Sequence, residues 1–362
     1  MPRPIRALLS ASAFSNNLKV ASSRAGKAKV WAVLKANAYG HGLERAAQAL
    51  GAADGFAVLD FEEAARLRGC GVRKPILMLE GVFQAADVAA LGRHALTPVL
   101  HNAEQLRMLA GADPGAAIDV YLKANTGMNR LGFDAQGLRD AYQALRASPR
   151  VRAVTLMTHF ADADGAGGVR DQLAAFERML APLGPVPRSL ANSAALLRFA
   201  AQTAADWVRP GIMLYGCSPF GQMSADSSAQ ALGLRPVMTL ASELISVRRL
   251  QRGERVGYGL SYEAAGPMTI GIAACGYADG YPRHAPSGTP VLVNGQRART
   301  VGRVSMDMIA IDVSGLPGVG VGTPVTLWGE GLSADEVGAA AGTLSYELFT
   351  KLTARVPVVE VP

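Results

Sequence analysis

The chain has 362 residues, of which 49% are hydrophobic and 18% charged, and its formal net charge is +7 at pH 7. This composition is typical of a compact globular protein with a large core and more than one domain. No window approaches the run of about 18 apolar residues that a membrane span needs. The basic residues are scattered, without an aromatic-basic cluster, so we expect neither a membrane nor a nucleic-acid partner.

The cysteine count and the N-terminus indicate the compartment. Three cysteines are too few, and odd in number, for a disulfide framework, which favours a reducing environment. The first residues carry two arginines but no sufficiently long apolar stretch, so no signal peptide is expected. We therefore expect a cytoplasmic protein.

The first two-thirds of the chain alternates short apolar runs with segments of helical periodicity. Helices are predicted at 61–68, 85–91, 103–110, 138–147 and 170–180. Strands are predicted at 28–34, 55–59, 75–79, 96–100, 117–122, 151–157, 188–190 and 207–214. Eight strands alternating with helices predict a closed parallel β/α barrel of the TIM type, and an open doubly wound sheet is the alternative.

After about residue 232 the pattern changes to short strands separated by turn signals. Strands are predicted at 237–247, 268–274, 290–293, 299–301, 308–313 and 324–328, with one short helix at 333–341. Asn294 and Gly295 lie between two of these runs and predict a hairpin turn. We therefore predict two domains, a β/α barrel over 1–232 and a mainly β domain over 233–362.

Lys35 is the most informative single residue. It follows the apolar run 30–34 and precedes a glycine-punctuated turn, which places it at the carboxyl end of a strand. A lysine in apolar surroundings is costly to keep charged, and a neutral amine is a nucleophile toward aldehydes. Taken alone, a lysine at such a position more often simply reaches solvent at the rim.

Other polar residues follow the remaining predicted strands. In a β/α barrel the carboxyl ends of the strands form the rim where active sites are assembled, so residues far apart in sequence could converge there. No histidine or cysteine group has metal-ligand spacing, so no metal site is expected. The polar residues at strand ends are Lys35, Asp60, Glu80, His101, Lys123, His159, Asn192 and Arg209.

The segment at 33–42 resembles the pyridoxal-phosphate lysine motif of the alanine racemases. Further segments of the chain resemble this family in the same order and over almost the whole length. The ordered set is much more specific than any one of its members. These segments are 123–130, 158–164, 191–195, 208–212, 256–259, 276–281 and 302–307.

The resemblance implies two catalytic bases. Lys35 would hold pyridoxal 5′-phosphate covalently and serve one face of the substrate α-carbon. Tyr258 would serve the opposite face, contributed in this family by the second subunit of a homodimer. Arg209 matches the arginine that faces the pyridine nitrogen, where a permanent positive charge disfavours protonation.

The resemblance also implies cofactor and substrate contacts. Arg130 matches the residue that binds the substrate carboxylate, and Lys123 beside it carries a carbamate in many relatives. Substrate-side positions across the dimer interface are matched by Met306 and Asp307, and a position at the entrance by Tyr277. Cofactor-binding positions are matched by Lys35, Tyr39, His159, Asn192, Ser193, Arg209, Gly211 and Ile212.

Two residues depart from the family pattern. Asn125 stands where many relatives have aspartate, which alters the charge balance beside Arg130. Ala354 stands where some relatives place a tyrosine on the phosphate, so one phosphate contact is expected to be missing or supplied by water.

The activity implied is an isomerase that interconverts L- and D-alanine with pyridoxal phosphate. It would supply D-alanine for peptidoglycan or serve alanine catabolism. The alternatives are a racemase of broader amino-acid range, a decarboxylase of similar architecture and a non-catalytic pyridoxal-phosphate carrier. A carrier would end after the barrel, so the second domain with Tyr258 and Asp307 argues against it.

Overall fold

The computed structural model describes residues 3–221 and 225–362. By their contacts, these residues fall into two compact units. The barrel unit comprises Ser15–Ala38 and Gly42–Leu214, and the C-terminal unit comprises the described parts of Met1–Phe14, Tyr39–His41 and Tyr215–Pro362. The N-terminal residues thus group with the C-terminal half of the chain. The predicted boundary at residue 232 stays a prediction.

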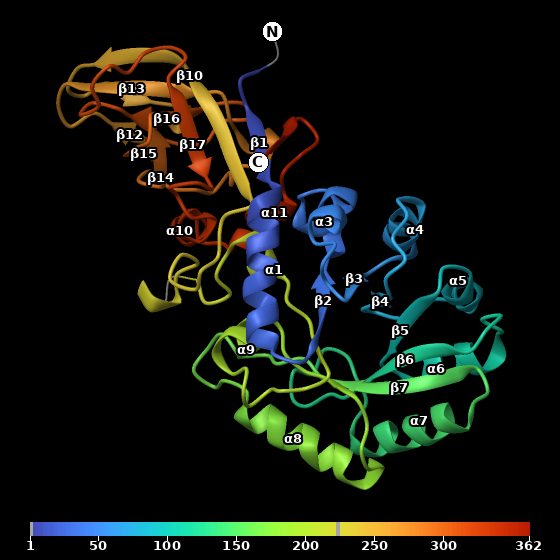
Figure 1. Ribbon diagram of the computed structural model, residues 1–362. Coiled ribbons are helices and arrows are strands. Elements are labelled where there is room, and N and C mark those ends of the chain that lie inside the picture. Colours follow the sequence, from blue (N-terminus) through green and yellow to red (C-terminus); the bar gives the residue numbers. More distant parts are fainter. Residues whose placement is uncertain (1–2, 222–224) are drawn as a thin grey trace. The chain divides into compact units, whose positions relative to one another are not determined.

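The barrel unit is built around a closed barrel of eight strands among the described residues, in the order of the chain (Figure 1). Neighbouring strands are parallel, and β2 also pairs with the last strand, which closes the barrel. The prediction of a closed β/α barrel is therefore confirmed. The strands are β2 (Lys29–Val33), β3 (Gly55–Val58), β4 (Ile76–Met78), β5 (Leu96–Leu100), β6 (Ile118–Lys123), β7 (Val151–Met157), β8 (Arg188–Ser189) and β9 (Trp207–Val208).

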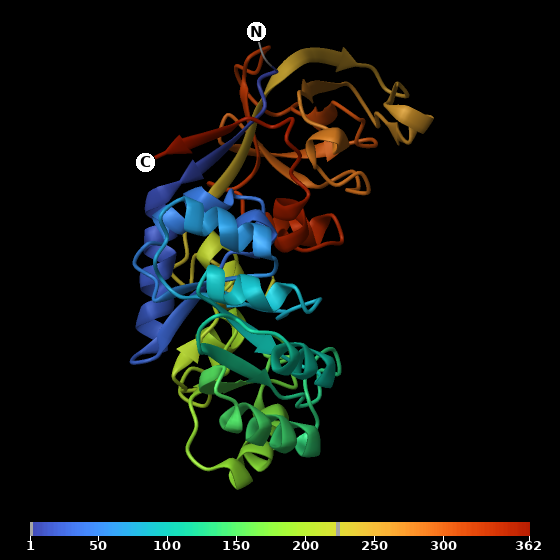
Figure 2. The same cartoon turned by 90° about the vertical axis from the view of Figure 1, so that its right-hand side faces the viewer.

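Helices between the strands lie on the outside of the barrel (Figures 1 and 2). Several begin at an Asp or Asn whose side chain accepts a hydrogen bond from a first-turn backbone N–H, as Asp60 does for α4 and Asn192 for α9. They are α3 (Leu43–Ala49), α4 (Phe61–Gly69), α5 (Asp87–Arg93), α6 (Ala103–Gly111), α7 (Ala135–Ala147), α8 (Arg170–Leu180) and α9 (Ser193–Arg198). A short 3₁₀ helix, η1 (Ala181–Leu183), follows α8.

The last predicted barrel strand, at 207–214, was too long. Only Trp207 and Val208 form a strand, and Ile212–Tyr215 is a 3₁₀ helix. Pro210 has no N–H to donate to a neighbouring strand, although its carbonyl still accepts a hydrogen bond from Val33. The apolar residues Ile212–Tyr215 beyond Pro210 are buried, but they form a 3₁₀ helix and not a strand.

The C-terminal unit is a mainly β structure around an eight-stranded sheet, as predicted. The Asn294-Gly295 hairpin is confirmed, because both residues have positive φ (48° and 74°) between antiparallel β14 and β15. The sheet strands here are β10 (Met238–Leu250), β13 (Met268–Ala273), β14 (Pro290–Val293), β15 (Gln296–Val301), β16 (Ile309–Asp312) and β17 (Pro324–Trp328). Around the sheet lie α10 (Ala334–Ala340), α11 (Ser345–Thr350), the ribbon of β11 (Arg255–Val256) and β12 (Tyr262–Glu263), and the 3₁₀ helices η3 (Ala225–Ser227), η4 (Tyr258–Leu260) and η5 (Tyr277–Asp279).

The two ends of the chain complete this sheet, which the sequence did not predict. Strand β1 (Arg6–Ser10) pairs antiparallel with β10, and the C-terminal strand β18 (Val358–Val361) pairs parallel with β1. Figure 2 shows β18 beside β1. The helix α1 (Ala11–Ala25) follows β1 directly.

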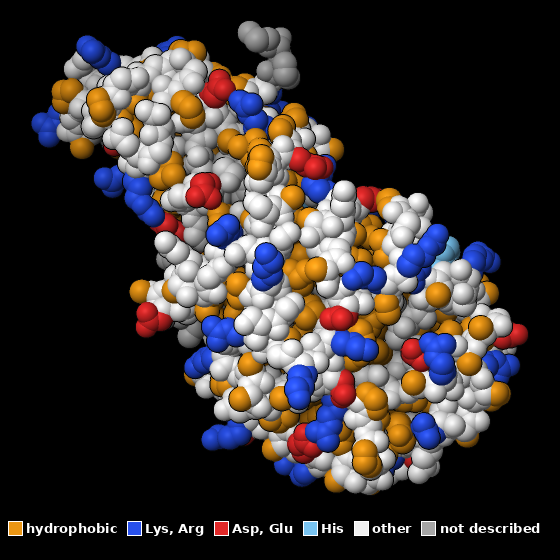
Figure 3. Space-filling model, in the orientation of Figure 1, with side chains coloured by type: hydrophobic (Ala, Val, Ile, Leu, Met, Phe, Trp, Pro, Cys, Tyr) orange, Lys and Arg blue, Asp and Glu red, His pale blue; other side chains and the backbone are white. Residues whose placement is uncertain are grey.

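Two further observations concern the surface and the helices. On the face drawn in Figure 3, Lys and Arg side chains are interspersed with acidic and uncharged ones and do not gather into one patch. Within the described residues, no helix combines the length and apolarity needed to cross a membrane.

Candidate active site

Lys35 lies directly after β2, at the carboxyl end of that strand, as predicted. Burial lowers the pKa of its amine, and the nearby positive charge of Arg130 lowers it further, while Glu80 and Glu63 oppose the shift. A lowered pKa increases the fraction of neutral amine, which is the nucleophilic form. The surroundings therefore favour reaction of Lys35 with an aldehyde.

The backbone after Lys35 is unusual. The short helix α2 (Lys35–Tyr39) is left-handed, with φ of 56°, 53°, 52° and 51° at Ala36, Asn37, Ala38 and Tyr39. Non-glycine residues avoid this region because Cβ approaches the following carbonyl oxygen. A run of four such residues needs external support. Two hydrogen bonds provide it: the Asn37 N–H donates to Glu63 Oε1, and Asn37 Oδ1 accepts from the Leu43 N–H.

Lys123 and Arg209 bring two more cations to the barrel. Lys123 ends β6 and is buried, and burial followed by the charges of Arg209 and Arg130 lowers its pKa to about 8. Arg209 is buried just after β9, and burial lowers its pKa to about 10. We call Lys35, Lys123, Arg130 and Arg209 the cationic cluster.

Arg209 is fixed by three hydrogen bonds. Its Nη1 donates to Ser189 Oγ at 2.6 Å, and its Nη2 donates to the carbonyl oxygens of Thr158 and Leu190 at 2.6 and 3.1 Å. These bonds use only the two terminal nitrogens of the guanidinium. Arg209 is therefore held rigidly, and its Nε takes no part in these bonds.

His159 is half-buried after β7. Burial holds the pKa of its ring well below the usual range, and the charges of Arg209 and Lys123 act in the same direction. The ring is therefore neutral near pH 7. It adds no further positive charge to the cationic cluster.

Of the positions matched to cofactor binding, Asn192, Ser193, Gly211 and Ile212 belong to the barrel unit, and Tyr39 does not. Ser193 Oγ accepts a hydrogen bond from the Gly211 N–H at 2.9 Å, so the loops after β8 and β9 are joined there, and Ile212 begins the following 3₁₀ helix, η2 (Ile212–Tyr215). Asn192 caps α9 through the N–H of Ala195. Tyr39, in contrast, belongs by its contacts to the C-terminal unit.

Tyr39 is buried, and its ring stacks on that of Tyr215 with centroids 4.5 Å apart. Burial also raises the pKa of its hydroxyl, so Tyr39 stays protonated and can donate a hydrogen bond. Tyr215 had no place in the sequence prediction, since an apolar run gives no sign of a stacking partner.

The departure at Asn125 has a clear local role. Its Oδ1 accepts hydrogen bonds from the N–H groups of Gly127 and Asn129, each at 3.1 Å, and its Nδ2 donates to Asn129 Oδ1. These bonds form the turn that leads to Arg130, whose side chain is exposed. The amide therefore supplies the acceptor that a carboxylate would supply at this position.

Three predicted site residues of the C-terminal unit are exposed to solvent. Tyr258 is 71% exposed, Met306 51% and Tyr277 38%. Asp307 Oδ1 accepts a hydrogen bond from Arg355 Nη2 at 2.6 Å, beside Ala354, which is also exposed. Within this unit these residues are available to a partner.

Arg3 also organises this region, and the sequence prediction missed it. It donates to both carboxylate oxygens of buried Asp279, at 2.7 and 3.1 Å, and to the carbonyl of Asp307 at 2.8 Å. Asp279 in turn accepts from the Gly276 N–H at 2.9 Å. No sequence pattern links residues this far apart.

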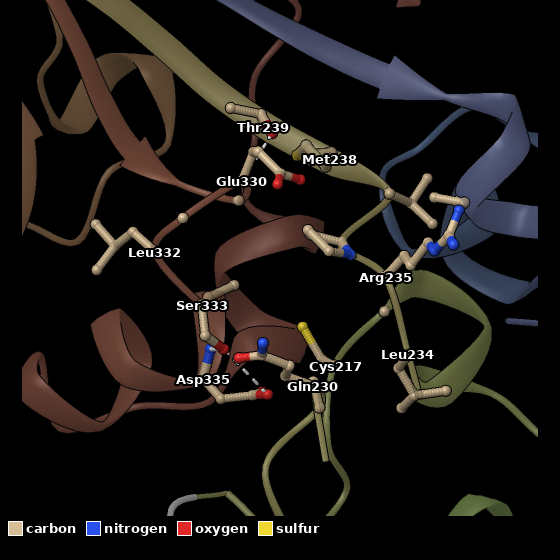
Figure 4. A pocket seen from close by; sticks show the side chains of 18 of the residues that line it. Cys217, Gln230, Leu234, Arg235, Met238, Thr239, Glu330, Leu332, Ser333 and Asp335 are labelled. Carbon is tan, nitrogen blue, oxygen red and sulfur yellow. Dashed lines mark hydrogen bonds between the residues drawn. The ribbon is translucent and has the colours of Figure 1, made fainter. Parts of the chain in front are cut away.

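A cavity of about 1100 Å³ lies elsewhere in the C-terminal unit (Figure 4). In the close-up, Cys217, Ser333 and Asp335 lie near one another along its lower side, and Asp335 accepts a hydrogen bond from the Ser218 N–H. None of the predicted site residues lines this cavity. It is therefore not the predicted site.

Together these features define a two-part protein, a closed β/α barrel carrying a cationic cluster of which Lys123 and Arg209 are buried, and a mainly β unit with exposed aromatic residues. The family model of the alanine racemase N-terminal domain matches residues 9–219, and that of the C-terminal domain matches residues 237–360. The chain belongs to the alanine racemase family.

Individual relatives agree over the full length. The alanine racemase of Thiobacillus denitrificans is 56% identical over 359 residues, covering 99% of this chain and 96% of the relative. The crystal structure of the biosynthetic alanine racemase from Pseudomonas aeruginosa is 49% identical with a TM-score of 0.95, covering 99% of this chain and 100% of that chain. The structure of the alanine racemase from Acinetobacter baumannii is 34% identical with a TM-score of 0.92, covering 99% and 100%.

Proposed function

We propose that this protein is an alanine racemase that interconverts L- and D-alanine with pyridoxal 5′-phosphate as cofactor. The observation that carries the proposal is the cationic cluster around Lys35, in a chain of this family. Burial and then the positive charge of Arg130 lower the pKa of Lys35, and burial with the charges of Arg209 and Arg130 lowers that of Lys123, so binding of anionic groups would relieve the repulsion. A phosphate ester and a substrate carboxylate are such groups.

The donor set fits this cofactor. Lys35 offers an amine for its aldehyde, and Ser193, Gly211 and Ile212 stand after the last two barrel strands, where barrels commonly bind phosphate. Asn192, His159 and Tyr39 would complete the cofactor contacts. When bound, pyridoxal phosphate supplies an electron sink that lets the α-hydrogen of an amino acid leave as a proton.

The chain's own residues would then move that proton. Lys35 Nζ would accept or return it on one face of the α-carbon, and its lowered pKa favours the neutral form that can act as a base. Tyr258 Oη would do the same on the other face. Arg209, which is rigidly held and keeps its charge, would disfavour protonation of the ring nitrogen.

Substrate orientation would come from the residues around these bases. Arg130 would bind the alanine carboxylate, and Met306, Asp307 and Tyr277 would border the substrate from the second subunit of a homodimer. The 71% exposure of Tyr258 in one chain supports such sharing, because a lone subunit leaves this base in solvent. Lys123 would carry a carbamate: its pKa of about 8 gives the neutral amine that reacts with carbon dioxide.

A carrier that only binds the cofactor is less well supported, because the chain continues into a second domain that matches the family's C-terminal model. We also propose a cytoplasmic location, with which the free cysteines Cys70, Cys217 and Cys275 agree. The D-alanine produced would feed peptidoglycan synthesis, or the enzyme would serve alanine catabolism.

The test is an absorbance spectrum of the purified protein followed by an L-alanine to D-alanine assay on the same sample. A band from lysine-linked cofactor together with D-alanine formation is expected. A band without racemisation would favour the carrier or decarboxylase alternatives. No band after addition of pyridoxal phosphate would refute the cofactor assignment.

Sharing of the site has its own test. If both subunits build each site, specific activity should fall as the enzyme is diluted through its dimer dissociation constant. Sedimentation or light scattering at the same concentrations would report the oligomeric state. Constant activity in a sample shown to be monomeric would contradict the sharing.

A further inference from the structure

Glu63 has no role in the family resemblance or in the sequence prediction, yet its carboxylate joins the Lys35 turn to the next strand. Its Oε1 accepts a hydrogen bond from the Asn37 N–H at 2.8 Å, and its Oε2 accepts from the Leu59 N–H at 3.3 Å. Asn37 is two residues after Lys35, and Leu59 directly follows β3. One buried carboxylate thus links the ends of two adjacent barrel strands.

The linked segment is the left-handed turn. Ala36, Asn37 and Ala38 have φ between 52° and 56°, a conformation that L-residues adopt only when their surroundings impose it. The Asn37 side chain holds the far side of the turn, because its Oδ1 accepts from the Leu43 N–H at 3.0 Å at the start of α3. Glu63 holds the near side, next to Lys35.

Glu63 is itself fixed in place. It lies in the first turn of α4, and its own N–H donates to Oδ1 of the helix cap Asp60 at 2.7 Å. A carboxylate that accepts backbone N–H groups makes stronger hydrogen bonds than a neutral acceptor. The support of the turn is therefore both directional and charge-dependent.

We propose that Glu63 is a positioning residue for Lys35: its carboxylate pins the left-handed turn to the end of β3 and so fixes where the Lys35 amine stands at the barrel mouth. This inference rests on the proposed function, because it concerns how the same lysine is held for cofactor and substrate. Glu63 acts through the backbone, besides the effect of its charge on the pKa of Lys35, and contacts neither cofactor nor substrate.

The substitution Glu63→Gln tests the proposal, because it keeps one acceptor oxygen but replaces the other with an NH₂ group. This NH₂ group is a donor, so it cannot accept the hydrogen bond of the backbone N–H that it faces. Glu62→Gln is the matched control, since Glu62 is the exposed neighbour on the same helix. The holoenzymes would be compared by kcat and KM for both alanine enantiomers and by visible circular dichroism of the lysine-linked cofactor band. Thermal unfolding would be recorded in parallel.

We expect E63Q to lower kcat by about 10- to 100-fold, as a displaced catalytic group does, while KM changes by less than about twofold. The circular dichroism band should weaken because the lysine-linked cofactor would no longer be held in a single orientation. E62Q should match the wild type. Wild-type kcat and circular dichroism in E63Q would overturn the proposal.

A second substitution separates positioning from general stabilisation. Ala36 is exposed, so Ala36→Gly removes the steric cost of its positive φ without loss of packing. The double variant E63Q/A36G should recover at least about threefold of the lost kcat, since the turn then needs less support. No recovery, with E63Q merely less stable to heat, would show a structural role only and overturn the proposal.

If E63Q does not fold, Glu63→Asp keeps the charge and shortens the reach by one methylene. Reduced kcat with unchanged KM in folded E63D supports the proposal, and unchanged kcat overturns it. Failure of the proposed function is distinguishable, because the wild type itself would then show no racemisation.

Discussion

Two cationic candidate residues of the barrel unit and two candidate residues on the substrate side of the C-terminal unit lie in opposite surroundings. In the barrel, Lys123 and Arg209 are buried, and their pKa values are lowered by burial. In the C-terminal unit, Tyr258 and Met306 stand more than half exposed. The barrel therefore encloses two of its cationic candidates within one chain, whereas these two candidates of the C-terminal unit meet solvent.

The largest effect is expected where the barrel holds the reacting amine. Lys35→Ala should abolish racemisation and the lysine-linked absorbance band, because no other group supplies the amine at that point. Lys27→Ala, at an exposed lysine before the same strand, should leave both intact. An active K35A variant would contradict the assignment of the reacting amine to the barrel unit.

The next effect concerns the exposed base of the C-terminal unit. Tyr258→Phe should keep the cofactor band but slow racemisation by about 10²- to 10⁴-fold, as loss of an acid-base group does, and more severely from L-alanine. Tyr262→Phe, in the same ribbon, is the control. Near-wild-type rates from both enantiomers in steady-state assays would remove Tyr258 from the mechanism.

The buried arginine should matter for stability as well as chemistry. Arg209→Met leaves Ser189 Oγ and the carbonyls of Thr158 and Leu190 without their donor, which should lower the free energy of unfolding by about 2–5 kcal/mol. Arg152→Met removes an arginine from an exposed pair with Asp119, worth less than about 1 kcal/mol. Denaturant unfolding would measure the free energy of unfolding of both variants. Equal decreases in the two variants would contradict the expected difference between the buried and the exposed arginine.

The smallest effect is a pH dependence from Lys123. Its pKa is lowered to about 8 in the folded chain from a usual value near 10.5, so the unfolded chain binds more protons between these values. Its contribution to stability therefore rises with pH across that window, by up to about 1.4 kcal/mol per pH unit. Lys123→Met should flatten this slope in denaturant unfolding of cofactor-free protein in carbonate-free buffer, whereas an unchanged slope would reject the lowered pKa.

Local patterns were sufficient for much of the fold. The strand predicted at 151–157 and the helix at 170–180 match β7 and α8 to the residue, because both are continuous elements with clear periodicity. The strand predicted at 207–214 was too long because Pro210 and the following turn end the pairing. Strands β1 and β18 were missed because their partners lie at the far end of the chain.

In the candidate site, too, some features could be predicted from the sequence and others depend on contacts between distant residues. Lys35 could be found from its place after an apolar run, and the family resemblance assigned roles to it and to the remaining site residues. The hydrogen bonds that hold these residues in place could not be found from the sequence. In the sequence, Glu63 is indistinguishable from the other charged residues of an amphipathic helix. Its contact with Asn37 depends on the packing of β2 beside β3.

The sequence by itself determined the alternation of strands and helices in the first part of the chain, the mainly β character of the last part, and the order of the motifs, since these depend on neighbours along the chain. Only the tertiary structure decided the closure of the barrel, the left-handed turn after Lys35 and the buried hydrogen bonds of Arg209. Each depends on groups brought together from distant positions in the chain. Local conformational preference does not predict such contacts, and for the left-handed turn it favours a different backbone conformation.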